Sequence, residues 1–262
     1  MKKVWKIQPT RVLGLMVVCA LAHVGHAGAA TYSTSSTTIL RDNATFVPKG
    51  VNCFTVFSPS GAGTKYDNFK NNWKFNTVRE YMDMSSVNWS SWDTITNAAI
   101  NRDMVVIIAN FGWGSTNATG WRPASHPNWS QIKSRWAEVA NRYKGKTNVW
   151  FNVWQYNQDM RELCKVIRDT GANNPIVIDA PYQGGGWTEI MAEGDNIRDG
   201  YGSVIFNIHC YGSNWSSYST NVDRFNQCKA DEPFFIEEYC SDDSFAIVDA
   251  ILDACTYTKV GA

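Results

Sequence analysis

Two consecutive carboxylates, Glu237 and Glu238, stand at the end of an apolar run in the C-terminal part of the chain. The run reads Pro-Phe-Phe-Ile-Glu-Glu-Tyr-Cys from residue 233 to residue 240. An apolar segment of this length is typical of a strand that is buried on both faces of a parallel sheet. In an α/β barrel the C-terminal ends of such strands carry the reacting groups. Glu238 is therefore the first candidate for a catalytic group. The alternative is that both glutamates begin a solvated loop after a core strand.

Apolar and amphipathic segments alternate along the chain and predict the elements that would position Glu238. Seven segments have the composition of strands: 47–57, 77–82, 104–109, 149–154, 176–179, 204–211 and 233–238. Helices are predicted after them at 66–73, 92–102, 130–143, 159–170, 189–193, 220–229 and 244–257. The stretch before residue 47 is polar and rich in Ser and Thr.

This alternation predicts parallel βαβ units. Seven pairs in this length favour an α/β fold of the (β/α)₈ TIM-barrel type that is one strand short, because the chain stops at Lys-Val-Gly-Ala where an eighth strand would begin. A missing strand would leave a sheet edge unpaired, so either the sequence is a fragment or another segment fills the gap. The alternative is a doubly wound open sheet, but no predicted strand is followed by the Gly-x-Gly-x-x-Gly loop of a nucleotide-binding sheet.

In a barrel, the residues at the ends of the predicted strands converge on one rim. These residues are Asn52, Cys53, Arg79, Glu80, Asn110, Phe111, Gln155, Tyr156, Asp179, His209, Tyr211, Glu238 and Tyr239. The set mixes carboxylates, a cation, a histidine and phenols, as acid–base or covalent catalysis would require.

Six short phrases in this order resemble the family 5 glycoside hydrolases, within the wider clan of retaining barrel hydrolases that includes cellulases and β-mannanases. They are Lys-Gly-Val-Asn at 49–52, Asn-Thr-Val-Arg at 76–79, Arg-Asp-Met-Val-Val-Ile at 102–107, Val-Ile-Asp-Ala-Pro at 177–181, Ile-His-Cys-Tyr at 208–211 and Phe-Ile-Glu-Glu-Tyr at 235–239. The resemblance covers nearly the whole chain after residue 30.

The resemblance implies a role for four of the rim residues. Glu238 would be the nucleophile, Arg79 the cation that keeps it ionised, Tyr211 a hydroxyl donor to it, and His209 a contact to the bound sugar. It further implies a β-linked oligo- or polysaccharide such as cellulose or mannan as the substrate, and no metal or organic cofactor. The competing interpretations are an ordinary ion pair of Arg79 with Glu80 or Asp83, and a hydrogen-bonded core histidine at 209.

The chain departs from the family pattern at the end of the fourth predicted strand. Where the family has Trp-Asn-Glu-Pro, with the glutamate as general acid/base, this chain reads Trp-Gln-Tyr-Asn at 154–157. Gln155 and Tyr156 therefore occupy the two functional positions. A phenol with a pKa near ~10 is a much weaker acid than a tuned carboxyl group. The alternative function is thus a barrel that binds glycan without cleaving it. Asp159 and Glu80 are the other acids considered, but Asp159 stands at a predicted helix N-terminus and Glu80 should point away from the barrel interior.

Tryptophan is abundant, with 12 residues in the chain. Aromatic faces stack on sugar rings but fill protein cores equally well. Five tryptophans on predicted loops are candidates for sugar contacts, of which Trp113 and Trp187 are assigned to the substrate site; the others are Trp89, Trp121 and Trp215. Three on predicted elements, Trp73, Trp136 and Trp150, are assigned to the core.

Residues 1–29 have the pattern of an export signal, with Lys2, Lys3, Lys6 and Arg11 before an apolar run and small residues at 27–29. Residues 30–262 then form a single domain, which we expect to be secreted or periplasmic, monomeric and free of the membrane after cleavage. With 24 basic and 24 acidic residues, the chain carries no charge excess that would favour nucleic acid. Six cysteines follow the leader, an even number that permits disulfides in an oxidising compartment.

Overall fold

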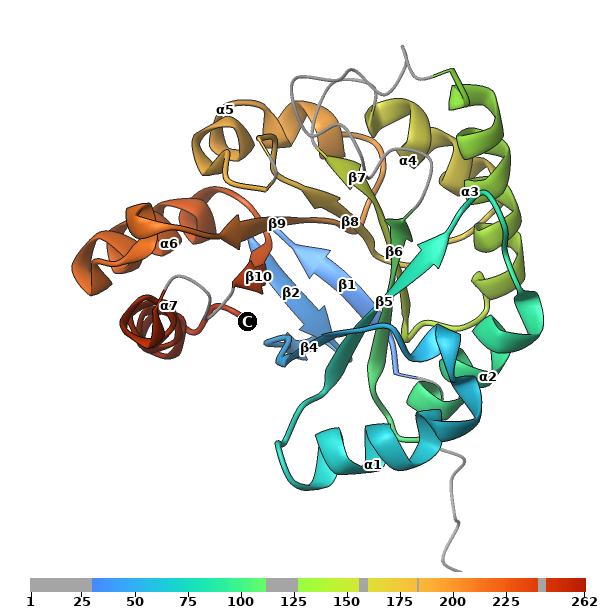
Figure 1. Cartoon of the computed structure of the whole chain (residues 1–262). Coiled ribbons are helices and arrows are strands. Elements are labelled where there is room, and N and C mark those ends of the chain that lie inside the picture. Colours follow the sequence, from blue (N-terminus) through green and yellow to red (C-terminus); the bar gives the residue numbers. More distant parts are fainter. Residues whose placement is uncertain (1–29, 112–126, 156–159, 183, 240–243) are drawn as a thin grey trace, which may run out of the picture.

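A parallel sheet curled into a nearly closed ring is the frame of the molecule, as the computed structural model shows for residues 30–111, 127–155, 160–182, 184–239 and 244–262 (Figure 1). Its seven strands follow the order β10-β9-β8-β7-β6-β5-β4. They are β4 (Gly50–Cys53), β5 (Thr77–Asp83), β6 (Val105–Phe111), β7 (Val149–Gln155), β8 (Ile176–Asp179), β9 (Val204–Cys210) and β10 (Phe234–Tyr239). Every neighbouring pair is parallel. The predicted TIM-type barrel with seven strands is therefore confirmed.

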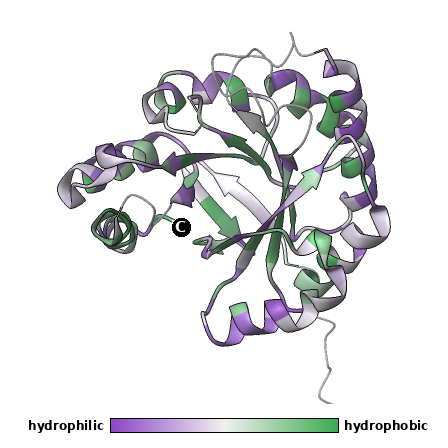
Figure 2. Cartoon of the chain, viewed as in Figure 1, coloured by the Kyte–Doolittle hydropathy of each residue, from purple (hydrophilic) through white to green (hydrophobic). Residues whose placement is uncertain are grey.

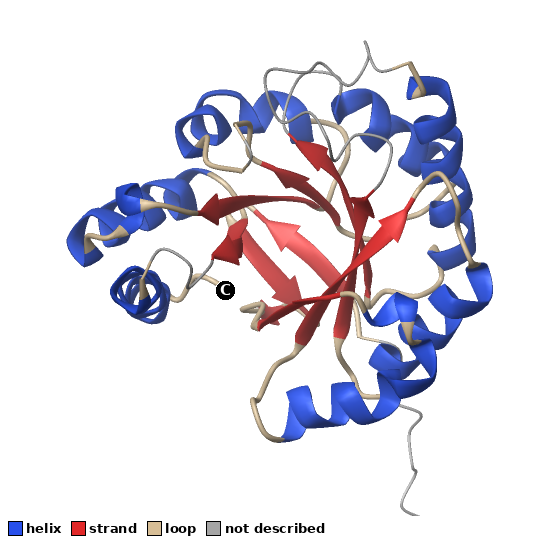
Figure 3. Ribbon diagram, viewed as in Figure 1, coloured by secondary structure: helices blue, strands red, loops and turns tan. Residues whose placement is uncertain are grey.

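Helices cover the outside of this ring (Figure 3). They are α1 (Ala62–Asn71), α2 (Trp89–Ile100), α3 (Trp129–Tyr143), α4 (Met160–Asp169), α5 (Trp187–Arg198), α6 (Tyr218–Asp231) and α7 (Phe245–Thr258). Figure 2 shows both polar and apolar residues on these helices, as expected for helices with one face on a sheet. The larger core lies between strands and helices and contains Trp136 and Phe151, whose rings meet edge to face.

A second, smaller core fills the N-terminal end of the ring. Here the hairpin β1 (Tyr32–Ser35) and β2 (Thr38–Arg41), extended by β3 (Ala44–Thr45), covers the first residues of the barrel strands. The rings of Tyr32, Phe46 and Trp150 pack edge to face with centroids 5.2–5.9 Å apart. Trp150 is buried, as predicted. The hairpin arises from the Ser- and Thr-rich stretch for which no element was predicted.

The last residues of the chain lie between the two edge strands of the ring. The backbone NH of Ile236 in β10 donates to the carbonyl of Gly261, over 2.8 Å. The NH of Ala262 donates to the carbonyl of Pro48, and the NH of Gly50 in β4 donates to the carbonyl of Ala262, each over 3.1 Å. These three hydrogen bonds link β10 to β4 through residues 261 and 262, at the position of the eighth strand of a full barrel.

Several local predictions need correction. The element expected as a turn at 189–193 is the three-turn helix α5. Trp73, assigned to the core, is 64% exposed because it follows the end of α1 instead of lying within it. Helix α3 has Asn128 at its N-cap rather than beginning at Ser130.

The five described cysteines after residue 30 are buried free thiols: Cys53, Cys164, Cys210, Cys228 and Cys255. Within the described ranges, no helix combines the length and apolar character needed to span a bilayer.

Candidate active site

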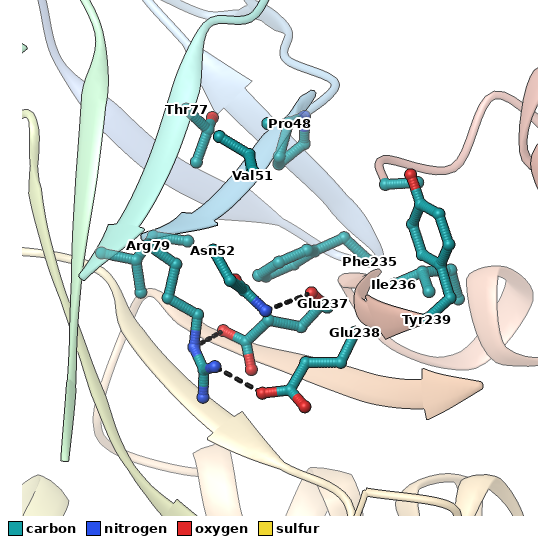
Figure 4. Close-up of a pocket in the computed structure, with 13 residues that line it drawn as sticks. Pro48, Val51, Asn52, Thr77, Arg79, Phe235, Ile236, Glu237, Glu238 and Tyr239 are labelled. Atoms are coloured by element: carbon teal, nitrogen blue, oxygen red, sulfur yellow. Dashed lines mark hydrogen bonds and ion pairs between the residues drawn. The ribbon is translucent and has the colours of Figure 1, made fainter. Parts of the chain in front are cut away.

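A β-bulge near the end of β10 brings two consecutive glutamates to the same side of the sheet (Figure 4). Ile236 pairs with Ile208 of β9, whereas Glu238, and not Glu237, pairs with His209. Glu237 is thus the extra residue of the bulge. In a regular strand successive side chains point to opposite faces, but a bulge shifts this alternation by one residue. Glu237 and Glu238 therefore both contact the same arginine inside the barrel.

Arg79 of β5 is the centre of the site, with only 6% of its side chain exposed. Its Nη1 lies 2.6 Å from Glu238 Oε1, and its Nε lies 2.9 Å from Glu237 Oε1. Nε and Nη2 also donate to Asn152 Oδ1 of β7, over 3.1 and 2.8 Å. Nη1 donates to the hydroxyl of Tyr81, over 2.5 Å. Burial lowers the pKa of this guanidinium, but the surrounding carboxylates outweigh that effect and raise it, so Arg79 is a permanent cation.

Glu238 is held as a carboxylate by donors on several sides. Tyr211 donates to its Oε2 over 2.6 Å, and Tyr81 donates to its Oε1 over 2.9 Å. His209 Nδ1 is 3.6 Å from Oε2. Burial alone would raise the pKa of Glu238, but His209, Arg79 and the two phenols lower it to about 2. With 18% of its side chain exposed, Glu238 is both ionised and accessible.

Glu237 has the opposite electrostatic character, although it lies on the same guanidinium. Its side chain is 1% exposed, and its Oε2 is 3.4 Å from His209 Nε2. Burial raises its pKa to about 7, with Arg79 lowering it and Asp179 raising it further. The two neighbouring glutamates thus differ in the charge state that their surroundings favour.

His209 is held between this acid pair and a glycine of the loop between β8 and α5. Its backbone NH donates to the carbonyl of Gly184 over 2.9 Å. Gly184 has φ +87°, and a Cβ placed on it would lie 2.2 Å from the imidazole Cγ. Burial would lower the pKa of His209, but the hydrogen bond to Glu237 and the nearby carboxylates raise it above its ordinary value. His209 is therefore buried and hydrogen-bonded, as in the core alternative, but its side-chain partners are the acids of this cluster.

Four of the residues assigned from the sequence, Arg79, His209, Tyr211 and Glu238, meet in one cluster. The predicted alternative, an ion pair of Arg79 with Glu80 or Asp83, is replaced by ion pairs with three carboxylates of β8 and β10. Glu80 points toward the helices, where it accepts hydrogen bonds from the Tyr66 hydroxyl and the Thr55 NH, each over 2.7 Å. It therefore lies away from the barrel interior, as expected.

Trp187 lies near this cluster but not within it. It begins α5 and lines a cavity of about 420 Å³ together with Tyr182, Gly185, His209, Tyr211, Asn214, Trp215 and Arg224. Gln155 ends β7 in register with Asp179 of β8, but its side chain is outside the described residues. Trp113, Trp121, Tyr156 and Asp159 also lie outside the described residues.

Three members of the cluster were not predicted. Tyr81 follows Arg79 by two residues, so strand alternation places both on one face. Asn152 lies in β7, and strand alternation does not point to it from the predicted Gln155, because the pairing of β7 with β8 shifts register between Asn152 and Gln155. Glu237 could not be found in this way, because its position depends on the bulge.

Asp179, His209 and Glu237 each offer one potential metal-ligating atom, and these atoms lie within 4.8 Å of one another. Arg79 already contacts the two carboxylates, at 3.8 Å from Asp179 and 2.9 Å from Glu237. Asn207 also donates to Asp179 Oδ1 over 2.6 Å. The guanidinium of Arg79 already supplies positive charge beside these two carboxylates. The cluster therefore does not favour a bound metal ion.

A cavity of about 280 Å³ extends from this cluster toward the link between the edge strands. Arg79, Glu237 and Glu238 line one part of it, and Gly50 and Ala262 line another. Figure 4 shows Asn52 beside Glu237, to whose backbone carbonyl its Nδ2 donates over 3.3 Å. The site is therefore open to the gap between β4 and β10.

Solved structures of similar shape come from β-glycan hydrolases. One is the catalytic domain of a mannanase from Streptomyces sp. SirexAA-E, with TM-score 0.71, 17% identity and coverage of 91% of this chain and 81% of that one. Another is a β-mannanase from Thermomonospora fusca, with TM-score 0.73, 20% identity and coverage of 89% and 83%. A third is a β-glucanase from Saccharophagus degradans in complex with cellotetraose, with TM-score 0.65, 13% identity and coverage of 89% and 83%. These likenesses show the fold.

No curated protein matches the chain in sequence. The profile of the cellulase family, glycosyl hydrolase family 5, matches residues 40–244. This match spans most of the chain, including the strands that carry Arg79, His209 and Glu238. The chain therefore belongs to glycosyl hydrolase family 5.

Proposed function

We propose that this protein is an exported β-glycan hydrolase that works with retention of configuration and uses Glu238 as its nucleophile. The observation that carries the proposal is the environment of the Glu238 carboxylate. It lies at the C-terminal edge of the barrel and contacts Arg79, Tyr211 and Tyr81 within 2.6–2.9 Å. A nucleophilic carboxylate must be charged to attack, and these contacts favour the charged form at neutral pH.

The reaction would proceed in two displacements. In the first, a Glu238 oxygen attacks the anomeric carbon and forms an ester, while the glycosidic C–O bond breaks and its electron pair leaves with the departing oxygen, which takes a proton from solvent unless it is stable as an anion. In the second, water attacks the same carbon, the bond to Glu238 breaks with its electron pair returning to the carboxylate, and the proton of the attacking water passes to solvent. Arg79, Tyr81 and Tyr211 orient Glu238 in both steps and accommodate the loss and return of its charge.

The substrate class follows from family membership and from the cavity beside the nucleophile. The relatives reported above are named as mannanases and as a β-glucanase bound to cellotetraose. The cavity beside His209 and Tyr211 is lined by polar and aromatic side chains, which suit hydroxyl groups and apolar faces of sugar rings. Arg224 already stacks on Trp187 and Trp215, at 5.7 and 4.8 Å from their ring centroids. Only the part of the Trp187 ring that Arg224 does not cover is therefore available to stack on a sugar.

Residues 155 and 156 favour a second candidate, a protein that binds β-glycan without cleaving it. Retaining enzymes use a second carboxyl group about 5–5.5 Å from the nucleophile to protonate the leaving oxygen, and this chain has Gln155 and Tyr156 at the corresponding place. Loss of a general acid typically costs on the order of 10²–10⁴ in rate. We expect hydrolysis of natural glycans to be slow and that of substrates with good leaving groups to suffer less.

An aryl β-glycoside with a good leaving group separates the two candidates. We expect a covalent adduct on Glu238 by mass spectrometry, and faster turnover with azide, because azide attacks the ester without having to lose a proton. Glu238→Gln should abolish the adduct, whereas Glu232→Gln, a buried glutamate outside the site, should retain it. Retained oligosaccharide binding with neither adduct nor turnover would establish the binding protein instead.

Restoring a carboxyl group at position 156 tests whether the general acid is missing from that position. Tyr156→Glu should raise activity on a natural β-glucan or β-mannan, and Gln155→Asn combined with it should restore the family pattern more fully. Tyr156→Phe is the matched control and should leave the parent's low rate unchanged. A folded Tyr156→Glu protein as slow as the parent would show that position 156 is not the site of the missing acid.

Export of a monomer completes the proposal. The basic and apolar pattern of residues 1–29 supports it. Expression of the full chain in bacteria should yield a protein in the periplasm or medium that begins near Ala30, as N-terminal sequencing would show. Light scattering of that material should give the mass of one domain.

A further inference from the structure

Glu237 is a buried acid whose position has no role in the two displacements. As the extra residue of the bulge in β10, it reaches Arg79 with Oε1, over 2.9 Å, and His209 with Oε2, over 3.4 Å. The same two side chains contact Glu238 with Nη1 of the arginine and Nδ1 of the imidazole. Each of the two basic side chains is therefore shared between the nucleophile and its neighbour in sequence.

We propose that Glu237 is a positioning residue that adjusts the reactivity of Glu238 by gaining or losing a proton, acting through Arg79 and His209. The inference rests on the proposed nucleophilic role of Glu238. It gives the bulge a function beyond turning Glu238 toward the cleft, because the bulge also places a second ionisable group on the same cation.

The charges around Glu237 do not balance when every acid is ionised. The groups that face the cluster are Arg79 and Tyr81 from β5, Asp179 from β8, His209 from β9 with Tyr211 directly after it, and Glu238 from β10. Two basic groups thus meet three carboxyl groups, and the phenols are neutral near pH 7. The cluster therefore favours one retained proton. Glu237, the least exposed carboxyl beside both bases, is the acid whose pKa burial raises to about 7.

The protonation state of Glu237 should alter the nucleophile in a definite direction. Below about pH 7, a neutral Glu237 leaves the positive charge of Arg79 and His209 to Glu238. Above it, an ionised Glu237 competes for both bases and adds a negative charge beside Glu238. The Glu238 carboxylate is then less stabilised before attack, and positive charge that develops on the sugar ring is better stabilised. Attack should therefore accelerate as the pH rises through about 7.

Glu237 does not qualify as the missing general acid. Its side chain is 1% exposed, against 18% for Glu238, and both of its oxygens face the chain's own basic groups. A group in this position does not reach a glycosidic oxygen in the cleft. Its influence passes through the side chains that it contacts.

Covalent labelling of Glu238 measures this influence without involving position 156. A 2-deoxy-2-fluoro-β-glycoside with a dinitrophenolate leaving group needs no proton from the enzyme. For the parent we expect the labelling rate to rise on the order of tenfold between pH 5.5 and 8.5. Glu237→Gln, which mimics the neutral acid, should lose the rise near pH 7 and keep at most a smaller rise at lower pH, where His209 then loses its charge. Glu237→Asp, which keeps a titrating group, should retain a rise.

Glu232 provides a matched control. Burial raises its pKa to about 7 as well, but it pairs with Arg198 outside the cluster. Glu232→Gln should label with the pH profile of the parent. A flat profile in the parent, or a step in Glu237→Gln equal to that of the parent, would overturn the inference. Should Glu237→Gln not fold, Glu237→Met, a neutral side chain of similar length, takes its place.

The ring signals of His209 in NMR give a readout that needs no activity, and His209→Asn assigns them. Removal of the Glu237 carboxylate takes away the hydrogen bond that raises the pKa of His209 and leaves the burial that lowers it. Glu237→Gln should therefore shift the His209 titration to lower pH, and Glu232→Gln should not. An unchanged titration in Glu237→Gln contradicts the coupling. If no variant is ever labelled but the titration shifts, the hydrolase proposal fails while the coupling stands.

Discussion

A buried glutamate contacts an arginine near each end of β10, but the two places differ in how many acids share the arginine. At the N-terminal end, Glu232 pairs with Arg198 Nε over 2.8 Å, and Arg198 also contacts Asp195 at the protein surface. At the C-terminal end, Arg79 contacts Glu237, Glu238 and Asp179 with almost no exposure to water. A glycine packs against each group: Gly194 against the Glu232 carboxylate and Gly184 against His209.

This difference indicates that the Arg198–Glu232 pair stabilises the fold, whereas the acids around Arg79 form a cluster that is suited to catalysis. In barrel enzymes the active site is built at the C-terminal ends of the strands, and only that end of β10 has more buried acids than cations. Burial raises the pKa of Glu232 and of Glu237 to about 7 alike. Glu237 shares its arginine with a second carboxylate inside the barrel, Glu238, whereas the acids near Glu232, Asp195 and Asp231, are exposed. The number of acids around the arginine, and not burial itself, distinguishes the site.

Removal of each arginine should give the largest contrast. Arg79→Met leaves three carboxyl groups without their buried cation and should cost about 3–5 kcal/mol in the free energy of unfolding. Arg198→Met should cost about 1 kcal/mol, because Glu232 can take up a proton near neutral pH. Urea denaturation of both variants at pH 7 measures the difference. If both variants lose the same free energy of unfolding, the number of acids around the arginine does not determine its contribution to stability.

The pH dependence of stability should reveal Glu232 next. Its ordinary pKa of 4.5 rises to about 7 in the folded protein, so its contribution to stability is full below pH 4.5 and is lost as the pH rises to about 7. This loss should amount to about 2 kcal/mol, and Glu232→Gln should remove it. Glu238 has the reverse sign: with a pKa lowered to about 2, it stabilises above pH 4.5 and loses that effect as the pH falls toward 2. Urea denaturation between pH 4 and 7.5 measures the free energy of unfolding. The prediction is wrong if this energy changes with pH in Glu232→Gln as it does in the parent.

The two glycines sharpen the comparison, because both should affect stability but only one should affect chemistry. A Cβ at Gly184 would lie 2.2 Å from His209 Cγ, and one at Gly194 would lie 2.4 Å from Glu232 Oε1. Overpacking by alanine should cost about 1–3 kcal/mol at either position, and Gly184→Ala should cost more because its φ of +87° also disfavours a side chain. Only Gly184→Ala should also slow labelling of Glu238, because a displaced His209 no longer helps to orient that carboxylate. Labelling that slows equally in Gly194→Ala would remove the distinction.

Tyr211→Phe should have the smallest effect. It removes one of the hydrogen bonds that orient the Glu238 carboxylate and leaves Arg79 and Tyr81 in place. The loss of orientation should slow labelling by about tenfold or less, in line with the ~1 kcal/mol of one hydrogen bond. Tyr218 is equally exposed, at 44%, and lies outside the cluster, which makes Tyr218→Phe a matched control. Identical labelling rates for the two variants would show that Tyr211 contributes nothing to the nucleophile.

The sequence predicted the barrel well where hydrophobic patterning decides the structure. The strand expected at 176–179 has those bounds as β8, and the other barrel strands fall within a few residues of their predicted positions. The N-terminal hairpin escaped prediction because its Ser- and Thr-rich strands are stabilised by packing of Tyr32 and Phe46 on Trp150, a contact between distant segments. The strand ends supplied Arg79, His209, Tyr211 and Glu238 as candidates, and the family resemblance supplied their expected roles. Glu237 required the structure, because strict alternation places it and Glu238 on opposite faces.

The link formed by Gly261 and Ala262 has a consequence for the motions of the ring. Two neighbouring residues and three backbone hydrogen bonds connect the edges of β10 and β4, whereas β5 and β6 are joined over seven residue pairs. A seam with so few hydrogen bonds should open without unfolding of the remaining sheet. The amide protons of Gly50 and Ile236 should therefore exchange with solvent earlier than those in the middle of β6. Because Glu237 follows Ile236 directly, each opening of this seam should also give water and protons a path to the buried carboxyl group beside Glu238.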